Sequence, residues 1–567
     1  MNRRDFLTKH IKTATTALAV DGNQPGKKPE EMYQNQTLPT DLELAATGVS
    51  TFTGTWTPAL AAHLLRRAGF GFNKQMLDAA VTAGMNATVD ALLNVNTTPP
   101  SPPLNNYSTA QNNDPNVPLG QTWVTAAPDP NFNFQREQSL RSWWTGLMLQ
   151  DGTVREKMTL FWHNHFATEL NIYGDAHYGY KHLALLRSFA TGNFKDFVKA
   201  VTTDPAMLRY LNGNVNTKTA PDENYARELQ ELFTLGKGPD SKYTEADVKA
   251  AARVLTGWRD SRTSINSFFD NTRHDTGNKQ FSSFYNNKTI TGKTGAAGAQ
   301  ETDELIEMIF EHNEVARFIC RKLYKFFVYY VIDQDIENNV IIPMATEFVA
   351  NNWEIKPVLA LLFKSEHFYD AYNHGCVIKP PTDFNIGLLR QFNVSIPAPD
   401  VPTEYQFLNY LWGVNALMQQ SPLDPPNVAG WPAYYQEPQY HELWINSDTL
   451  PKRNQISDLM VLLGYKRNGH TLIIDSIAFA DQFTDAADPN KLIDNTLLML
   501  FSIGISQTQK DFLKSILLSG QSSDHYWSDV WNTYKSTPGD TNNTNMVKTR
   551  LQTMFKYLMN LAEYQLS

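Results

Sequence analysis

Apolar residues recur at spacings of three and four along most of this chain, which is the period of an amphipathic α-helix. One such stripe consists of Val154, Met158, Phe161, Trp162, His165 and Phe166. The same period predicts helices at residues 58–68, 73–93, 136–149, 223–236, 302–311, 314–330, 344–351, 356–363, 409–418, 455–463, 492–501, 509–518 and 545–564. Thr57 before Pro58, and Thr244 three residues before Asp247, are typical of helix starts.

Alternating apolar and polar positions, the pattern of a half-buried strand, are scarce in this chain. The best short candidates are residues 281–290 and 471–474. A stretch rich in Pro and Asn at residues 97–133 is too long for a simple connection. We therefore predict a mostly α fold, a large single helical domain at residues 55–567 with long irregular loops and at most a few short strands.

The start of the chain resembles a twin-arginine export signal, because Arg3 and Arg4 precede Phe6 and Leu7. We predict this signal at residues 1–20 and a flexible linker, rich in Gly, Pro, Thr and Asn, at residues 21–54. A plain basic N-terminus is the alternative. The signal predicts a periplasmic or extracellular location.

Composition narrows the possible partners. The 567 residues have a net charge of −9 and are 42% hydrophobic, which is ordinary for a globular protein and argues against nucleic-acid binding. The longest apolar stretch, residues 318–332, contains three basic residues, so we expect no transmembrane segment. Cys320 and Cys376 are the only cysteines. They form either one disulfide or two buried free thiols.

Several short phrases, taken in order, resemble one protein family. They are residues 63–71 (HLLRRAGFG), 155–157 (REK), 160–166 (LFWHNHF), 204–208 (DPAML), 223–229 (ENYAREL), 231–236 (ELFTLG), 247–248 (DV), 255–258 (LTGW), 274–275 (HD), 379–380 (KP), 425–432 (PPNVAGWP) and 562–566 (AEYQL). This ordered set resembles the domain of unknown function 1800 (DUF1800) family from about residue 57 onward. The resemblance implies exported bacterial proteins with no established reaction. It also implies a sulfatase-like partner of a second family, domain of unknown function 1501 (DUF1501).

The predicted helix at residues 223–236 has a polar face beside its apolar stripe. Asn224, Arg227 and Glu228 lie at offsets of three and four on that face. An arginine can hold a carboxylate, sulfate or phosphate with two hydrogen bonds, and a glutamate can act as acid, base or metal ligand. We take all three as candidate catalytic residues and expect their face to line a polar pocket shared with residues 163–166. A solvated helix face is the alternative.

Two histidines suggest a metal site. His163 and His165 are two residues apart, so on a helix they point about 200° from each other. His165 and Glu169, four residues apart, form the better helical pair. His163, His165 and Glu169 are therefore candidate ligands for a divalent metal, and a hydrogen-bonded core histidine is the alternative at His165.

Two loops add further candidates. His274 and Asp275 lie in a polar stretch, where such a pair can act as a catalytic base or ligand. The proline-rich residues 425–435 include Trp431, Tyr434 and Tyr435, whose rings could stack on the sugars of a polysaccharide. The alternative is a loop packed over its own aromatic side chains.

These features support two hypotheses. The first is an exported envelope protein that binds a ligand or assists a sulfatase-like partner. The alternative is a metal- or acid/base-dependent hydrolase that acts on polysaccharide in the envelope. The first is preferred, because the sequence contains no complete nucleophile–base arrangement or metal motif.

Overall fold

The computed structural model describes residues 47–567 except positions 97 and 538. The predicted export signal and most of the predicted linker lie outside the described residues. The rest of the linker packs on the body of the protein: the Phe52 N–H donates to Lys364 O, and Thr51 forms a β-bridge with Ser365. The packed body therefore includes residues before position 55.

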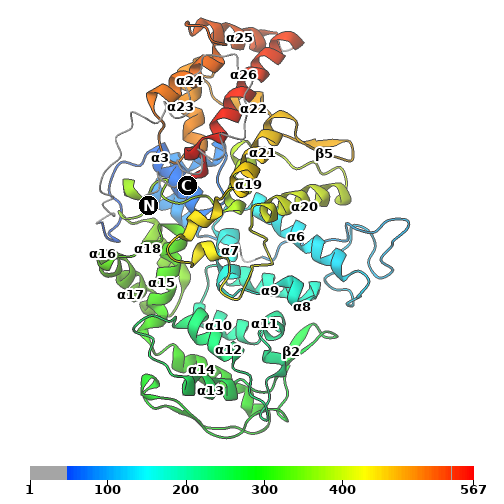
Figure 1. Ribbon diagram of the computed structural model, residues 1–567, viewed down its shortest axis with the longest axis vertical. Helices are drawn as coiled ribbons and strands as arrows, with labels where there is room; N and C mark the ends of the chain where they lie inside the picture. The colour runs from blue at the N-terminus through cyan, green and yellow to red at the C-terminus, as the bar shows by residue number, and fades with distance from the viewer. Residues whose placement is uncertain (1–46, 97, 538) are drawn as a thin grey trace.

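The prediction of a mostly α fold is confirmed (Figure 1). In the first half of the chain the α-helices are α3 (Pro58–Ala68), α4 (Lys74–Ala83), α5 (Met85–Leu92), α6 (Asn133–Gln150), α7 (Arg155–His165), α8 (Leu170–Tyr173), α9 (Ala176–Ser188), α10 (Phe194–Thr202), α11 (Pro205–Tyr210), α12 (Asn224–Glu228) and α13 (Glu245–Val254). The later α-helices are α14 (Gln300–Ile309), α15 (Asn313–Phe327), α16 (Gln334–Ile336), α17 (Ile342–Ala350), α18 (Ile355–Phe363), α19 (Pro381–Gln391), α20 (Val401–Leu417), α21 (Thr449–Leu462), α22 (Ser476–Asp481), α23 (Pro489–Leu500), α24 (Gln507–Leu517), α25 (His525–Ser536) and α26 (Thr541–Asn560).

Shorter helical turns connect these helices. Two are π-helical, η2 (Leu229–Thr234) and η5 (Glu337–Ile341). The 3-10 turns are η1 (Gly213–Val215), η3 (Ser283–Tyr285), η4 (Gly295–Ala299), η6 (Ala371–Asn373), η7 (Pro432–Tyr434), η8 (Tyr440–Trp444) and η9 (Ala562–Gln565).

The strands of the described chain form three small antiparallel pairs. They are β1 (Trp258–Ser261) with β2 (Asn266–Phe269), β3 (Lys279–Gln280) with β4 (Thr289–Ile290), and β5 (Tyr465–Arg467) with β6 (His470–Leu472). The predicted strand at 281–290 is confirmed only at Thr289–Ile290. The residues before these form η3 and then a turn at Asn286 and Asn287, which both adopt left-handed backbone angles. The predicted strand at 471–474 overlaps β6. The β1–β2 pair was not predicted.

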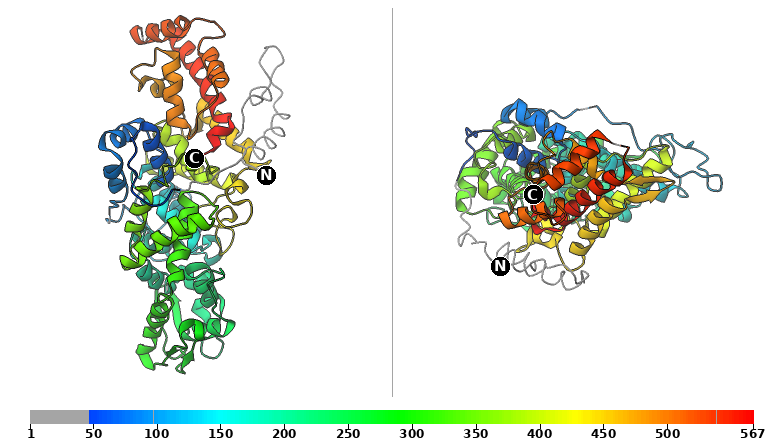
Figure 2. Two further views of the ribbon diagram at one scale, coloured as in Figure 1. Left: turned by 90° about the vertical axis from the view of Figure 1, so that its left-hand side faces the viewer. Right: turned by 90° about the horizontal axis from the view of Figure 1, so that it is seen from above.

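The molecule is elongated (Figures 1 and 2). Helices α24, α25 and α26 form one end, α13 and α14 lie at the other, and α3, α7 and α19 lie between them. Helix α6 packs on α20, α15 on α17, and α26 on α21, α22 and α25. Among the described helices, none is both long and apolar enough to cross a membrane.

Two clusters of buried apolar side chains hold these elements together. The larger runs from α3 to α26, and the smaller surrounds Trp123, Trp144 and Trp431. The long loop before α6 belongs to the smaller cluster, and a buried ion pair of 3.0 Å joins Asp114 in the loop to Arg136 on α6. This loop is therefore a packed part of the fold.

Local signals in the sequence explain where several helices begin. Thr57 caps α3 by accepting from the Leu60 N–H, and Thr244 and Asp247 form a reciprocal capping box at α13. Cys320 and Cys376 are both buried and no disulfide joins them, which agrees with the alternative of two buried thiols.

Candidate functional site

The two histidines of α7 point in opposite directions and hold different parts of the chain. His163 Nε2 accepts a hydrogen bond of 3.0 Å from the Leu423 N–H. Burial lowers the pKa of His163 to about 3, so the ring is neutral at neutral pH. Next to it, Asn164 Oδ1 accepts from the Trp431 N–H at 2.8 Å. The end of α7 therefore fixes the proline-rich loop in place.

His165 faces the π-helical turn η2. Its Nε2 lies 3.1 Å from Phe233 O, and its Nδ1 lies 2.9 Å from Lys322 Nζ, so the neutral ring donates to the first and accepts from the second. Glu169 accepts from the Tyr210 hydroxyl at 2.7 Å. The structure thus does not bring His163, His165 and Glu169 together. In the described part of the chain, no three His, Cys, Asp or Glu side chains lie where they could hold one metal ion.

The predicted helix at 223–236 begins as α12 and changes to π-helix at Leu229. Arg227 lies at the surface, where it forms ion pairs with Glu245 at 2.7 Å and with Glu223 at 3.1 Å. Asn224 is exposed and Glu228 is half-buried, and burial raises the pKa of Glu228. This polar face is therefore a charged surface, which is the alternative considered from the sequence.

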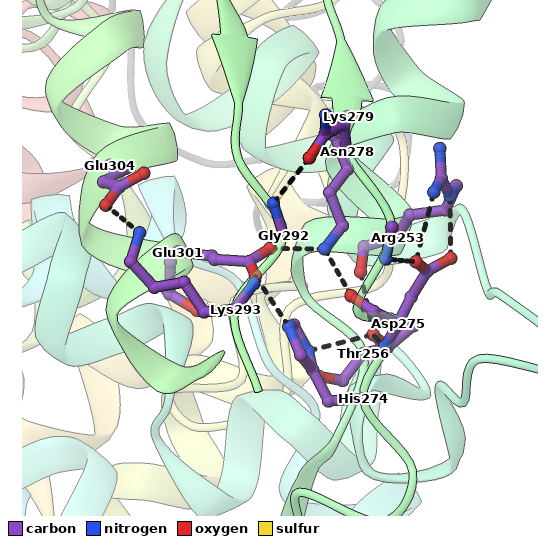
Figure 3. Close-up of polar contacts among 12 residues, drawn as sticks. Arg253, Thr256, His274, Asp275, Asn278, Lys279, Gly292, Lys293, Glu301 and Glu304 are labelled. Carbon is purple, nitrogen blue, oxygen red and sulfur yellow. Dashed lines mark hydrogen bonds and ion pairs between the residues drawn. The ribbon is translucent and has the colours of Figure 1, made fainter. Parts of the chain in front are cut away.

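His274 belongs to a buried charge network between the β3–β4 pair and α14 (Figure 3). Its Nε2 lies 3.1 Å from Glu301 Oε1 and its Nδ1 lies 2.8 Å from Thr256 O. Glu301 also forms a salt bridge with Lys279, and the side chains of His274, Glu301 and Lys279 are at most 1% exposed. Both ring nitrogens of His274 thus face oxygen atoms, one from Thr256 and one from Glu301.

Asp275 lies beside this network and points toward another partner. Its carboxylate accepts two hydrogen bonds from Arg253, at 2.8 and 3.1 Å, and the guanidinium contributes to holding the pKa of Asp275 below its usual value. In the described chain, no hydrogen bond or ion pair joins His165, Glu228 and His274. The candidate residues chosen from the sequence therefore do not form one site.

A different region contains two neighbouring pockets with charged and aromatic walls. The larger and more open pocket, here called the vestibule, has a volume of about 450 Å³. Its walls are Arg321, Lys325, Tyr330, Val331, Ile332, Glu337, Glu437, Pro438 and Tyr440. The rings of Tyr330 and Tyr440 are stacked, with centroids 4.7 Å apart and planes at 22°. Lys325 Nζ donates to the Tyr440 hydroxyl at 3.1 Å and lies 4.9 Å from that ring's centroid.

The second and more enclosed pocket, here called the deep chamber, has a volume of about 20 Å³. It shares Lys325, Tyr330 and Tyr440 with the vestibule. Its further walls are Arg67, Lys157, Phe326, Val377, Pro380, Asp383, Ala433, Tyr434, His441 and Trp444. Such a volume admits about one water-sized group, so a larger ligand could place only a substituent there.

The electrostatics of the deep chamber are dominated by buried cations. Lys157 Nζ donates to Asp383 Oδ2 across 226 positions of sequence, and both side chains are less than 10% exposed. Burial lowers the pKa of Lys157, and the charge of Asp383 opposes that effect. Burial also lowers the pKa of Lys325 and raises that of Tyr434. Among the described residues, Asp383 Oδ1 has no hydrogen-bond partner.

Three helices and one loop position these walls. Lys157 comes from α7, Lys325 from α15 and Asp383 from α19. The loop that supplies Tyr434 and Tyr440 is held by the end of α7, as described above. Close packing there requires Gly430, which has a φ of +88°, since a Cβ atom would lie 2.1 Å from Asn164 Oδ1.

Comparison with known proteins identifies the family of this chain. The family model described as "Protein of unknown function (DUF1800)" matches residues 63–566. The chain belongs to the DUF1800 family. No curated protein and no solved structure matches it.

Several DUF1800-like phrases of the sequence meet at the cavity. Residues 63–71 supply Arg67, residues 155–157 supply Lys157, residues 379–380 supply Pro380, and Tyr434 follows residues 425–432. Of these residues, only Tyr434 is among the candidates predicted from the sequence, as one of the aromatic rings of the proline-rich loop. A signal for Lys157 was present, because it lies three residues after Val154 and four before Phe161, on the apolar stripe of α7. A lysine at such a position is buried and needs a partner.

Proposed function

We propose that this DUF1800 protein is an exported binding component of the envelope that recognises an acidic polysaccharide. The observation that supports it is a wide aromatic vestibule next to a small, basic deep chamber, with Lys325, Tyr330 and Tyr440 lining both. Rings of tyrosine provide flat apolar surfaces with polar edges, on which sugar faces can pack. Lysine and arginine side chains provide charge-assisted hydrogen bonds to carboxylate or sulfate groups.

The two volumes suggest how such a ligand would lie. A sugar ring fits the vestibule of about 450 Å³, beside Tyr330 and Tyr440. The deep chamber of about 20 Å³ has room for one oxygen of an acidic substituent, and the rest of that group would stay in the vestibule beside Lys325. A planar carboxylate needs less room there than a tetrahedral sulfate. The shared chemistry is thus an anionic group on a sugar, with carboxylate favoured over sulfate.

Binding to defined oligosaccharides tests this proposal. Oligomers of a uronic acid, of a sulfated glucan and of the neutral glucan would be titrated into the purified protein by calorimetry. We expect the acidic oligomers to bind and the neutral one to bind at least tenfold more weakly. Lys325→Met should weaken acidic binding by about 10- to 100-fold, the value of one charge-assisted hydrogen bond. Lys452→Met is the matched control, since Lys452 is an exposed partner of Asp448 on α21.

Equal binding of the neutral and acidic oligomers, or no effect of Lys325→Met, would contradict the proposal. A second variant, Tyr440→Ala, tests the contribution of the aromatic wall separately from that of the charge. Loss of the aromatic wall should weaken binding of every oligomer that binds, whatever its charge.

The alternative of a hydrolase is favoured by one feature of the vestibule. Glu337 and Glu437 both line it, and glycoside hydrolysis commonly uses a pair of carboxylic acids. Glu337 is held by Arg321 at 2.6 Å, and Glu437 accepts from the Tyr440 hydroxyl at 3.0 Å. Release of new reducing ends from the acidic oligomers, abolished in Glu437→Gln, would establish the hydrolase instead of a binding component.

Export and a partner complete the proposal. The Arg3–Arg4 pair motivates export, and replacing both by lysine should retain the protein in the cytoplasm. Undiminished export of that variant would contradict a twin-arginine route. A sulfatase-like DUF1501 partner is consistent with a sulfated or otherwise acidic substrate. Co-purification of the two tagged proteins from one envelope fraction, against an unrelated exported protein, tests it.

A further inference from the structure

Asp383 also borders a second small chamber, on another side of α19. This chamber, here called the anion chamber, has a volume of about 20 Å³. Its walls are Arg66, Gly71, Lys379, Asp383, Gly387, Gln391 and Ser567. A Cβ atom at Gly71, where φ is +83°, would lie 3.2 Å from the Gly387 Cα, so these two glycines let α19 approach the end of α3.

The positively charged side chains around this chamber donate their hydrogen bonds to uncharged backbone carbonyl groups. Arg66 donates to Leu498 O at 2.6 Å and to Met499 O at 3.2 Å. Lys379 Nζ donates to Tyr564 O at 2.6 Å and lies 4.0 Å from the centroid of that ring.

A third cation, Arg453, is fully buried and shows the same pattern. It donates to Lys379 O at 2.9 Å and to Gln565 Oε1 at 3.4 Å. Within the described chain, Arg66, Lys379 and Arg453 form no ion pair with any carboxylate. Their hydrogen bonds therefore leave the positive charge unbalanced.

Asp383 is the one carboxylate whose charge acts on several of these groups, among them Lys379 and Arg453. Its Oδ2 is already committed to Lys157. Burial lowers the pKa of Arg66 to about 9, which shows how strongly the surroundings disfavour its charge. Buried charges require compensation, and hydrogen bonds to carbonyl groups supply only part of it. In addition, the Nε atoms of Arg66 and Arg453 are buried and have no hydrogen-bond partner among the described residues.

We propose that the anion chamber binds a small monovalent anion of the halide class, such as chloride, beside Arg66 and Lys379. The chamber volume suits a single atom and excludes a phosphate or sulfate. Gln391, whose amide donates to Met499 O at 2.9 Å, lies at the same wall. Asp383 is the one acidic side chain that lines the chamber, and Lys157 offsets its charge. The bound anion would join α3, α23 and the residues 562–567, because Arg66 on α3 bonds to Leu498 and Met499 on α23, and Lys379 bonds to Tyr564 O. This site is independent of polysaccharide binding.

Thermal unfolding of the full chain tests the site. Melting temperatures would be measured in potassium chloride, bromide and gluconate at equal ionic strength. Binding to the folded state alone should raise the Tm by about 1 °C for each tenfold increase in chloride above its Kd, given the entropy of unfolding of a chain this long. Gluconate is too large for the chamber and should give no such rise. Broadening of the ³⁵Cl resonance by the protein, removed by added bromide, provides a measurement that needs no variant.

Arg66→Gln and Lys379→Met should each abolish the difference between chloride and gluconate. Arg550→Gln is the matched control, because Arg550 on α26 also donates to backbone carbonyls, Leu517 O and Tyr526 O, far from this chamber. It should keep the chloride dependence. Identical Tm values in chloride and gluconate, together with no ³⁵Cl broadening, would overturn the proposal and show that the chain balances this charge itself. Loss of the dependence in Arg550→Gln as well would overturn the assignment to this chamber.

Discussion

Replacing Asp383 by asparagine removes the carboxylate that pairs with Lys157 while keeping the shape of the side chain. The Lys157 and Asp383 side chains are 4% and 8% exposed, so the ammonium would be left in a nearly dry site. Breaking a buried pair by removing one partner costs about 3–5 kcal/mol. We expect the upper part of this range, since Asp383 also stabilises the charges of Arg67 and Arg453.

The same geometry predicts an asymmetry between the two partners. Lys157→Met leaves Asp383 near other cations, including Arg67 and Lys379, whereas Asp383→Asn leaves Lys157 with no carboxylate partner. The lysine variant should therefore lose less stability than the aspartate variant, and the double variant less than the sum of the two. This ordering distinguishes a shared carboxylate from an isolated ion pair.

Urea denaturation, followed by both tryptophan fluorescence and circular dichroism, measures these differences. Coincident transitions would justify a two-state treatment of a chain this long. Asp78→Asn is the control, because the Lys74–Asp78 pair on α4 is exposed and should contribute less than about 0.5 kcal/mol. A loss below about 1 kcal/mol in Asp383→Asn, or a larger loss in Lys157→Met, would refute the reasoning.

Three further predictions concern other parts of the fold. The pKa of His163 falls from 6.5 to about 3 on burial, so unfolding takes up a proton between these pH values. Stability should therefore decrease as pH falls through that window, by up to about 5 kcal/mol from this group, and a urea midpoint that rises on acidification would contradict it. Glu301→Gln should cost about 3–5 kcal/mol in urea unfolding because it strands the buried Lys279, while Glu304→Gln, at a 44% exposed position, should change little; equal losses would argue against the buried network. Arg227→Ala should cost less than about 1 kcal/mol, since the side chain is 30% exposed, and a loss above 3 kcal/mol would restore the pocket predicted on this face.

The fold could be predicted from the sequence where short-range signals decide it. The helical period, the cap at Thr57 and the capping box at Thr244 depend on residues a few positions apart, and all are present in the structure. The helix at 223–236 shows the limit of such signals. Its composition favours α-helix throughout, but tertiary contacts shift it to π-helix at Leu229, where Gln230 donates to Ala226 O and accepts from the Tyr285 hydroxyl.

The candidate site could not be predicted in the same way. Its parts are contributed by segments hundreds of residues apart, and the pairing of Lys157 with Asp383 leaves no trace in local spacing. Histidines and glutamates were predicted as site residues because of their chemistry. In the structure, however, His163 bonds to the backbone, and His165 bonds to the backbone and to Lys322. Two local signals pointed to this region: the position of Lys157 on an apolar stripe, and the aromatic side chains of the proline-rich loop, which include Tyr434.

The partners of α3 have a consequence for how this chain acquires its structure during synthesis. Arg66 bonds to residues more than 430 positions later, and Arg67 reaches Ser567, 500 positions away. Helix α3 is made early, but these acceptors leave the ribosome much later. Until those segments are synthesised, the apolar face of α3, with Leu64 and Leu65, lacks some of its final packing partners. Closing such long loops is entropically costly and slow. The nascent chain should thus depend on chaperones that shield this helix, and fragments lacking the C-terminal helices should aggregate rather than fold as independent units.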